Sequence, residues 1–453
     1  MIQVSYCLDK NLIIKIMYKK LLSDSAVYGL GAIFIKAIAF FTLPIYTKIF
    51  SPSEFGIIEM FSTIGGILSI FMTMGLDSAQ SYYFMEAKNK KNHTIQEITT
   101  SILGLRIILG IGVVGIVTIF APFILDFAFD TKQPMIYLLM VASSIFFANL
   151  ISQSLEIFRL IYKPWHYIGL SFIQTVFNIG LILYLTYIEE MGIYGYFLGN
   201  LIASFVVMFI GWIATKDYRY FKSLNTSLWM DFLKFGAPLV PAGFSIWVMQ
   251  ASDRWFVMKM LGSYDLGIYS VGAKFAMLIA LAVEVFRKAW WPIAMDMLHK
   301  PEGSEFIRKI SFWYILLGSI ASVILAIIAP YLVAYLVDNK YYESYKLIGV
   351  LGWSGIFYGF YLISELGIFK SKKTYLSIVT NLAGALLNII LNYFLIQSFG
   401  LIGAAYATVI SLMIANMIGM NISNKFLYVR WQWLSYGLFI FTSLAITVYL
   451  GSV

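Results

Sequence analysis

An aspartate and an arginine stand side by side in an otherwise apolar stretch, WVMQASDRWFV, which runs from Trp247 to Val257. On a helix, Trp247, Gln250 and Arg254 fall on one stripe, because they stand at positions i, i+3 and i+7. Such a stripe offers an aromatic face, an amide and a guanidinium, and a guanidinium binds phosphate in a forked geometry. Asp253 lies about 100° around the helix from Arg254, so we expect the two charges to have separate partners.

The composition of the chain is that of a membrane protein. Of 453 residues, 60% are hydrophobic and 12% are charged, whereas soluble domains carry about 25% charged residues. A soluble fold of this composition would expose large apolar patches. The net charge of +9 does not indicate a nucleic-acid partner, because the basic residues fall in short gaps between apolar runs and not on one hydrophilic face.

The residues that commonly bind metals are scarce. The single cysteine, Cys7, excludes an internal disulfide and a multi-cysteine metal site. The three histidines lie far apart in loops, so we expect no metal site, no cofactor and no catalytic residue. No cleavable signal peptide is evident, because the apolar stretch before Met17 is short and contains Lys15. Met17 is a second candidate for the native start beside Met1.

Thirteen apolar runs have the length of a membrane-spanning helix, which needs about 20 residues. Turn-rich breaks such as SPSEFG, LGSYDLG and KSKKT separate them, and no gap could hold a soluble domain. The sequence therefore predicts an all-helical integral membrane protein. The predicted spans are 24–48, 56–84, 99–125, 134–158, 166–188, 193–215, 236–260, 265–286, 310–337, 345–369, 374–397, 401–423 and 433–451.

Two pairs of similar segments indicate an internal duplication. TKIFSPSEFGI, from Thr47, resembles MKMLGSYDLGI, from Met258, at an offset of 211 residues that pairs Gly56 with Gly267. KPWHYIGLSFIQTVFNIGL, from Lys163, resembles KTYLSIVTNLAGALLNIIL at an offset of 210. An even number of spans per unit produces parallel repeats, and transporters with such repeats bind substrate at the interface between them.

The duplication defines the expected domains. We expect two six-helix bundles around a central cavity, with one extra C-terminal helix. The boundaries are a cytoplasmic N-terminal segment at 1–23, an N-lobe at 24–215, a cytoplasmic linker at 216–235, a C-lobe at 236–423 and the extra transmembrane helix at 431–453.

Four segments of the chain resemble one known family. LPIYTKIFSPSEFG (from Leu43), GLDSA (from Gly75), LKFGAPLVPAGFSIWVMQASDRWFVMKMLGSYDLGIYSVGAKFA (from Leu233) and NIILNYFLIQSFGLIGAAYAT (from Asn388) occur in that order. The set resembles the Wzx-type polysaccharide flippases of the multidrug/oligosaccharidyl-lipid/polysaccharide (MOP) exporter superfamily. Members often carry an arginine shortly after GLDSA, where this chain has Tyr82, so no role of that arginine carries over.

The resemblance implies a transporter and not an enzyme. Such proteins move undecaprenyl-diphosphate-linked oligosaccharides across the bacterial cytoplasmic membrane by alternating access, for O-antigen, capsule or exopolysaccharide synthesis. A polysaccharide polymerase and a chain-length regulator are candidate partners beside the lipid-linked oligosaccharide and membrane lipid. The alternatives are a lipid II flippase, a multidrug or cation exporter of the same superfamily, and a membrane polysaccharide polymerase, although no nucleophile–base constellation or long outer loop favours the last.

Three cations fall deep inside predicted spans: Lys36, Arg254 and Lys274. Each charge at the bilayer centre costs about 2.5–3.5 kcal/mol on insertion scales. We identify Asp253 as the only acid at comparable depth, so we expect a positively charged cavity that matches a diphosphate. Pairing with an acid on another helix and snorkelling to the interface are the alternatives. Asp253 would orient a neighbouring cation or couple an ion.

A further set of charged residues stands near the predicted cytoplasmic ends of spans. We interpret them as an inner-gate network of ion pairs, with ordinary interface positions as the alternative. The set consists of Arg106, Glu156, Arg159, Glu284 and Glu365.

The distribution of lysine and arginine predicts the topology. With the N-terminus in the cytoplasm, 23 of the 32 basic residues lie in inside segments, five lie outside and four lie within spans. Basic residues are enriched in cytoplasmic loops, so thirteen spans leave the C-terminus outside. Accessibility of terminal tags to impermeant reagents tests this: an N-terminal tag should be protected in intact cells and a C-terminal tag exposed. A protected C-terminal tag would contradict the predicted number of crossings.

Overall fold

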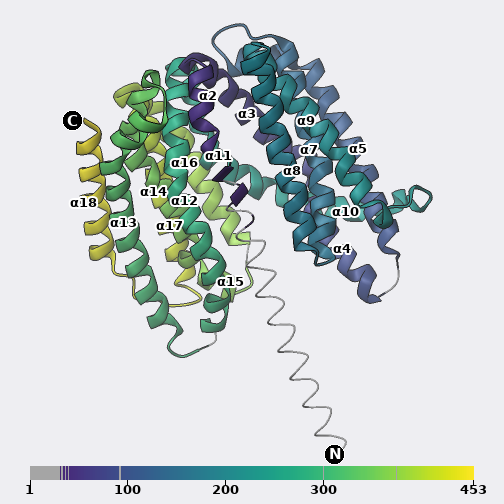
Figure 1. The fold of residues 1–453 in the computed structure, drawn as a ribbon. Helices are drawn as coiled ribbons and strands as arrows, with labels where there is room; N and C mark the ends of the chain where they lie inside the picture. Colours follow the sequence, from purple (N-terminus) through teal and green to yellow (C-terminus); the bar gives the residue numbers. More distant parts are fainter. Residues whose placement is uncertain are drawn as a thin grey trace, which may run out of the picture.

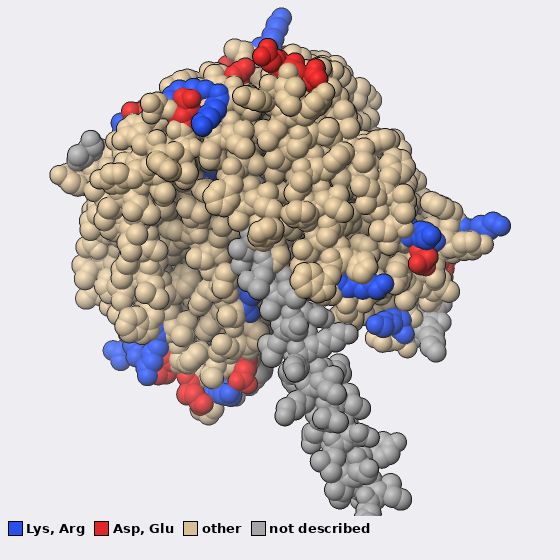
Figure 2. Space-filling view, in the orientation of Figure 1, with Lys and Arg blue, Asp and Glu red and all other residues tan. Residues whose placement is uncertain are grey.

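The computed structural model describes residues 31, 34–35, 37–38, 40–90, 93–298, 300–373 and 375–452. Within these ranges the regular structure is helical, and twelve helical segments are long and apolar enough to cross a membrane. Figure 2 shows the charged residues gathered toward opposite ends of the molecule, with a wide band of uncharged surface between them. Such a band matches the hydrocarbon core of a bilayer, so the chain is a multi-pass membrane protein.

The helices form two groups, which lie together at one end of the molecule and diverge toward the other (Figure 1). The first group comes from the first half of the chain. Its helices are α2 (Leu43–Ile49), α3 (Pro52–Thr73), α4 (Leu76–Lys90), α5 (Ile95–Ile119), α6 (Ala121–Ala128), α7 (Met135–Leu160), α8 (Pro164–Leu183) with its π-helical end at Tyr184–Ile188, α9 (Gly192–Ala214) and α10 (Trp229–Gly236).

The second group comes from the second half of the chain. Its helix α18 packs on the outer side of the group against α13 and α14, as expected for an extra C-terminal helix. The helices are α11 (Val240–Met260), α12 (Ser263–Met297), α13 (Gly303–Leu336), α14 (Tyr345–Ser364), α15 (Leu366–Lys370), α16 (Tyr375–Phe399), α17 (Leu401–Ser423) and α18 (Trp433–Ser452).

The twelve segments correspond in order to the second through thirteenth predicted spans. The start of the first predicted span, 24–30, lies outside the described residues, as do 32–33, Lys36, 39 and Met17. The all-helical fold class with two bundles is confirmed, whereas the residue boundaries of the lobes stay predictions. The eighth span was predicted to end at 286, but α12 continues through Pro292 to Met297, because charges at 287 and 288 end an apolar run without ending a helix.

Local sequence signals define both ends of α3. Ser51 and Glu54 form a capping box, in which the Ser51 backbone N–H donates to the Glu54 carboxylate at 2.8 Å. The C-terminal end follows from Met74 and Gly75, whose φ angles of 45° and 69° break the predicted second span into α3 and α4. A Cβ on Gly75 would stand 2.4 Å from the Gly236 carbonyl oxygen, so glycine also permits the close approach of α10.

The linker between the groups lies against the first group. The Trp229 indole N–H donates to the Ser101 carbonyl oxygen at 2.9 Å, and the Asn225 amide donates to Glu97 at 2.8 Å. Arg219 donates to the Ser154 hydroxyl at 2.9 Å. Burial lowers the pKa of Arg219 to about 10, so this guanidinium remains protonated at neutral pH and holds the linker to α7.

Glycines at matching positions of the duplication bring the two groups into contact. A Cβ on Gly56 would stand 1.9 Å from the Ser263 carbonyl oxygen, and one on Gly267 would stand 2.0 Å from the Pro52 carbonyl oxygen. The starts of α3 and α12 therefore cross at backbone contact. The two-fold relation of the repeats stays a prediction.

Hydrogen bonds between the groups surround this crossing. The Tyr341 hydroxyl donates to the Phe50 carbonyl oxygen at 3.0 Å, and the Trp255 indole N–H donates to the Phe127 carbonyl oxygen at 3.0 Å. Lys259 donates to two carbonyl oxygens at the C-terminal end of α6, at 2.9 and 3.0 Å, where a cation also stabilises the helix dipole. The predicted topology places this end on the outer side of the membrane.

The glycine crossing leads to a stability prediction. Gly56→Ala forces a methyl group against backbone atoms that cannot rotate away, and overpacking of this kind costs about 1–3 kcal/mol. We expect a melting temperature in detergent several degrees below that of the wild type. Gly112→Ala on α5, where an added Cβ meets nothing within 4 Å, serves as the control and should melt at or above the wild-type temperature. Equal melting of Gly56→Ala and the wild type would contradict the contact.

Candidate functional site

The adjacent charges on α11 do meet, contrary to the expectation that they have separate partners. The Arg254 guanidinium donates to the Gln250 carbonyl oxygen at 2.8 Å and lies 3.5 Å from Asp253 Oδ1. The same Oδ1 accepts the Arg254 backbone N–H at 2.8 Å. The second oxygen, Oδ2, accepts hydrogen bonds from the hydroxyls of Tyr269 on α12 and Thr408 on α17. Asp253 thus joins three helices while it neutralises Arg254.

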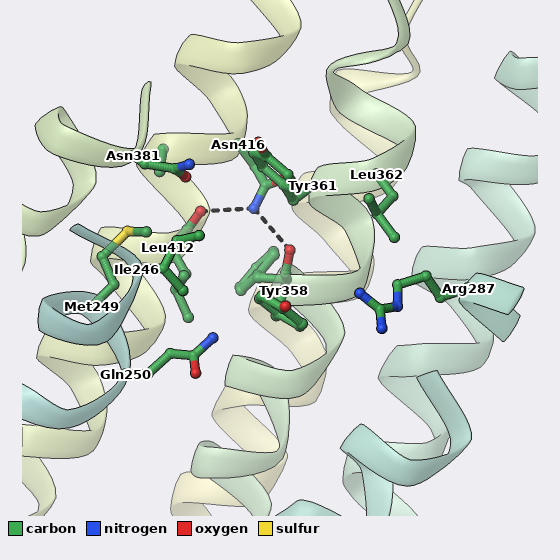
Figure 3. A pocket seen from close by; sticks show the side chains of 12 residues that line it. Ile246, Met249, Gln250, Arg287, Tyr358, Tyr361, Leu362, Asn381, Leu412 and Asn416 are labelled. Atoms are coloured by element: carbon green, nitrogen blue, oxygen red, sulfur yellow. Dashed lines mark hydrogen bonds between the residues drawn. The ribbon is translucent and has the colours of Figure 1, made fainter. Parts of the chain in front are cut away.

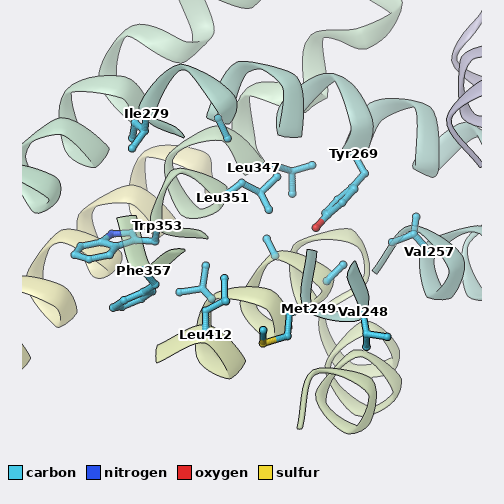
Figure 4. Close-up of a cluster of buried hydrophobic side chains, with 14 of the residues drawn as sticks. Val248, Met249, Val257, Tyr269, Ile279, Leu347, Leu351, Trp353, Phe357 and Leu412 are labelled. Atoms are coloured by element: carbon cyan, nitrogen blue, oxygen red, sulfur yellow. The ribbon is translucent and has the colours of Figure 1, made fainter. Parts of the chain in front are cut away.

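Asp253 is held in apolar surroundings. It is only 4% exposed, and Figure 4 shows the Tyr269 hydroxyl directed into a cluster that includes Val257, Leu347 and Leu351. Burying a carboxylate is costly unless it receives hydrogen bonds or lies beside an opposite charge. The Tyr269 and Thr408 hydroxyls and the Arg254 guanidinium supply them.

Arg254 faces a cavity of about 340 Å³ inside the second helix group. Gln250, one turn before Arg254, also lines it, as the helical spacing predicts. Asp253 and Glu284 line the same space, so the cavity presents two acids beside the one arginine. The expected excess of positive charge is therefore absent from the described lining of this cavity.

Gln250 also reaches a neighbouring cavity of about 130 Å³ between α11, α12, α14, α16 and α17. Figure 3 shows Gln250 and Arg287 on opposite sides of Tyr358. Above them, the Asn416 amide donates to the Phe357 and Leu412 carbonyl oxygens at 3.0 and 2.9 Å. Gln250 and Tyr358 line both cavities, so the two spaces adjoin along one face of α11.

Trp247 does not share the cavity of Arg254. Its indole stacks on Phe244 with ring centroids 6.0 Å apart. The indole nitrogen also lies 2.7 Å from where a Cβ on Gly66 would stand. Trp247 therefore packs between α11 and α3. Of the predicted stripe, only Gln250 and Arg254 line the same cavity.

Lys274 has an acidic partner that the sequence reading missed. Its ammonium nitrogen lies 2.8 Å from Glu59 Oε1, in an ion pair between α12 and α3. Asp253 is thus not the only deep acid, and the described pairs Arg254–Asp253 and Lys274–Glu59 balance in charge. Glu59 stands three residues inside the predicted start of its span, and no sequence pattern links it to a lysine 215 positions later.

Lys274 and Arg254 also face different spaces. Lys274 lines a cavity of about 510 Å³ whose other lining residues come from the first helix group, whereas Arg254 lines the 340 Å³ cavity in the second. The neighbouring residue on α12, Ala273, lines the cavity of Arg254. The two cavities therefore lie on either side of one turn of α12, and only Lys36 of the three predicted cations stays outside the described residues.

The inner-gate candidates of the first group form a connected network. Arg106 is buried, lies beside Asp77 and donates to the Asn149 side chain at 2.8 Å. The Glu156 carboxylate accepts from Arg159 at 2.6 Å and from the Ser81 hydroxyl at 2.5 Å. The Ser81 hydroxyl also contacts the Asp77 carbonyl oxygen at 3.0 Å, so the network joins α4, α5 and α7.

The candidates of the second group are separate from that network. Glu284 pairs with Arg287 on the same helix at 2.8 Å. Glu365, fully buried, accepts hydrogen bonds from the hydroxyls of Ser377 and Thr380 on α16. Among the described residues, no ion pair joins these acids to the first group. Their role as an inner gate stays a prediction.

The fold is that of a transporter class. Over 94% of this chain and 92% of the other, the structure resembles the lipid II flippase MurJ in an inward closed conformation, with a TM-score of 0.70 and 17% identity. An inward-facing MATE family transporter of the MOP superfamily matches 91% of this chain and 96% of its own, with a TM-score of 0.67 and 15% identity. At such identities the likeness concerns the fold.

The sequence places the chain in a particular family. The family model described as "Polysaccharide biosynthesis protein" matches residues 21–298, more than half of the chain. The chain belongs to this family. A protein of the Lsg locus of Haemophilus influenzae is 25% identical over 73% of this chain and 81% of its own length. An uncharacterized membrane protein of Methanocaldococcus jannaschii is 23% identical over 88% of this chain and 97% of its own length.

The Glu59–Lys274 pair leads to a double-mutant prediction. Lys274→Met and Glu59→Gln each leave one charge without its partner inside the membrane-spanning bundle, so we expect both to lower the melting temperature. The double variant should lose less stability than the two single variants together, because no unpaired charge remains. Coupled neighbours of this kind show about 0.5 kcal/mol or more of interaction energy. Strictly additive losses in the four-protein cycle would contradict a direct pair.

Proposed function

We propose that the protein is a flippase that carries undecaprenyl-diphosphate-linked oligosaccharide from the cytoplasmic to the outer leaflet of the bacterial cytoplasmic membrane. Membership of the polysaccharide biosynthesis family supports a role in glycan assembly, and the fold shared with MurJ and MATE transporters supports transport. The protein acts without covalent chemistry. A polysaccharide polymerase and a chain-length regulator are its proposed partners.

The observation that carries the proposal is the position of Arg254. Its side chain is 22% exposed and faces a cavity within the membrane-spanning region, while a carboxylate on its own helix neutralises it. A guanidinium can exchange one carboxylate for a phosphate of similar geometry. Because Asp253 keeps the hydroxyls of Tyr269 and Thr408, Arg254 can turn toward a diphosphate without leaving Asp253 unsatisfied.

The three predicted cations therefore have different proposed roles in binding phosphate. Arg254 is the proposed phosphate ligand, and Gln250 beside it supports the same cavity. Lys274 binds a phosphate only by releasing Glu59, so it is the proposed secondary ligand. Lys36 remains a proposed ligand on the sequence argument alone.

A cation exporter is the second candidate, and a specific observation favours it. Asp253 and Glu284 both line the cavity of Arg254, and acids in a cavity suit a cationic substrate or a coupling ion. Reconstituted vesicles distinguish the candidates. A flippase moves lipid-linked oligosaccharide to the opposite leaflet, whereas an exporter moves a fluorescent organic cation and leaves the lipid in place.

Substitution of Arg254 tests the proposed phosphate contact. Arg254→Ala should abolish translocation of lipid-linked oligosaccharide while the yield and elution profile of the folded protein are retained, because Asp253 keeps two hydroxyl donors. Arg254→Lys should retain part of the activity, since it preserves the charge without the forked geometry. Arg308→Ala, which removes a half-buried guanidinium that lines neither cavity and pairs with Glu305 on its own helix, is the matched control and should transport normally.

Two results would contradict this assignment. Normal translocation by Arg254→Ala would exclude Arg254 as a ligand. Loss of folded protein in both Arg254 variants, with Arg308→Ala intact, would identify the Arg254–Asp253 pair as structural.

A further inference from the structure

The cavity of about 510 Å³ in the first helix group has a lining rich in amides and hydroxyls. Gln174, Thr175 and Asn178 reach it from α8, and Asn200 and Ser204 reach it from α9. Its volume is in the range of small-molecule sites, about 300–1,000 Å³. Neutral polar side chains in a membrane-spanning bundle are costly unless they meet partners or water, so this concentration requires an explanation.

The two faces of α8 differ sharply. Gln174, Thr175 and Asn178 are half-buried and line the cavity, whereas Val176 and Phe177 are 44% and 38% exposed on the other face. The polar residues therefore lie on the cavity face of α8, opposite its exposed apolar face. They point toward the interior of the first group.

The amides retain unused hydrogen-bonding capacity. The Asn178 amide donates to Asn200 Oδ1 at 3.2 Å, and the Ser204 hydroxyl donates to the same oxygen at 3.4 Å. Each primary amide offers two donors and a carbonyl acceptor, so the Asn200 NH₂ group and the Asn178 carbonyl remain available. Gln174 makes no side-chain hydrogen bond within the described part of the chain.

The second half of the chain treats the equivalent position differently. At the repeat offset of 210 residues, Asn178 corresponds to Asn388 on α16. Asn388 is fully buried, accepts a hydrogen bond from Ser252 at 2.7 Å and donates one to Ser411 at 3.1 Å. One repeat therefore uses the asparagine to join helices, while the other leaves it facing a cavity.

We propose that this cavity, defined by Gln174, Asn178 and Asn200, is the glycan subsite, which binds hydroxyl groups of the sugar next to the diphosphate. Sugar hydroxyls both donate and accept hydrogen bonds, as do neutral amides. Tyr46 and Tyr196, in edge-to-face contact at 5.8 Å, supply an aromatic wall. The inference rests on the proposed function, since the cavity of Arg254 would hold the diphosphate on the other side of α12.

The test separates the sugar from the lipid diphosphate. Purified protein is titrated with two probes, the lipid-linked oligosaccharide extracted from the native strain and undecaprenyl diphosphate without sugar. The double variant Gln174→Ala/Asn178→Ala should bind the first probe about tenfold more weakly, as expected for the loss of one or two hydrogen bonds, and the second probe as the wild type does. The double variant Val176→Ala/Phe177→Leu on the lipid face of α8 should bind both probes normally.

The outcomes distinguish this inference from the proposed function. If the wild type binds neither probe, the proposed function fails. If the wild type binds both and the amide variant loses neither, or loses both equally, the glycan subsite is overturned while the flippase proposal stands. A melting temperature within a few degrees of the wild type shows that the amide variant is folded; should it unfold, Asn178→Asp, which keeps the shape of the side chain, replaces it with the same expected selectivity for the sugar-bearing probe.

Discussion

Hydrocarbon offers no hydrogen-bond partner, and this constraint orders the polar residues of the protein. Arg254 and Lys274, which the structure places inside the bundle, each have a carboxylate nearby, Asp253 and Glu59. Asp253 in turn receives hydroxyls from two other helices, so a single buried acid connects α11, α12 and α17. The charges that could bind cargo are thus the same charges that hold the helices in place.

This double use has a consequence for transport. The cavity of Arg254 holds two acids beside the one arginine, so the proposed lipid diphosphate binds there only if Asp253 gives up its cation. The pairs Arg254–Asp253 and Lys274–Glu59 differ in how readily they can separate. Asp253 has further donors, whereas Glu59 depends on Lys274. Release of Arg254 is therefore the less costly step, and the cargo would compete with an internal anion for each cation it meets.

The two halves of the chain have similar residues at matching positions, but these residues do not always have the same contacts. Matching glycines, Gly56 and Gly267, allow the two units to touch at backbone distance. The matching asparagines differ in their surroundings. Asn388 is hydrogen-bonded to a neighbouring helix, whereas Asn178 lines a cavity. The contacts between the units gather at the end that the predicted topology places outside, and many use backbone carbonyl oxygens as acceptors.

The sequence by itself determined the all-helical membrane fold and the order of the twelve described spans, because hydropathy is a local property of the chain, whereas the duplication it indicates stays a prediction. It also placed Gln250 beside Arg254, because helical spacing decides which residues share a face. Only the tertiary structure decided which charges pair: Glu59 reaches Lys274, and Trp247 reaches α3 instead of the cavity. Such pairings depend on how separate helices pack, and hydropathy does not encode the packing of one helix against another.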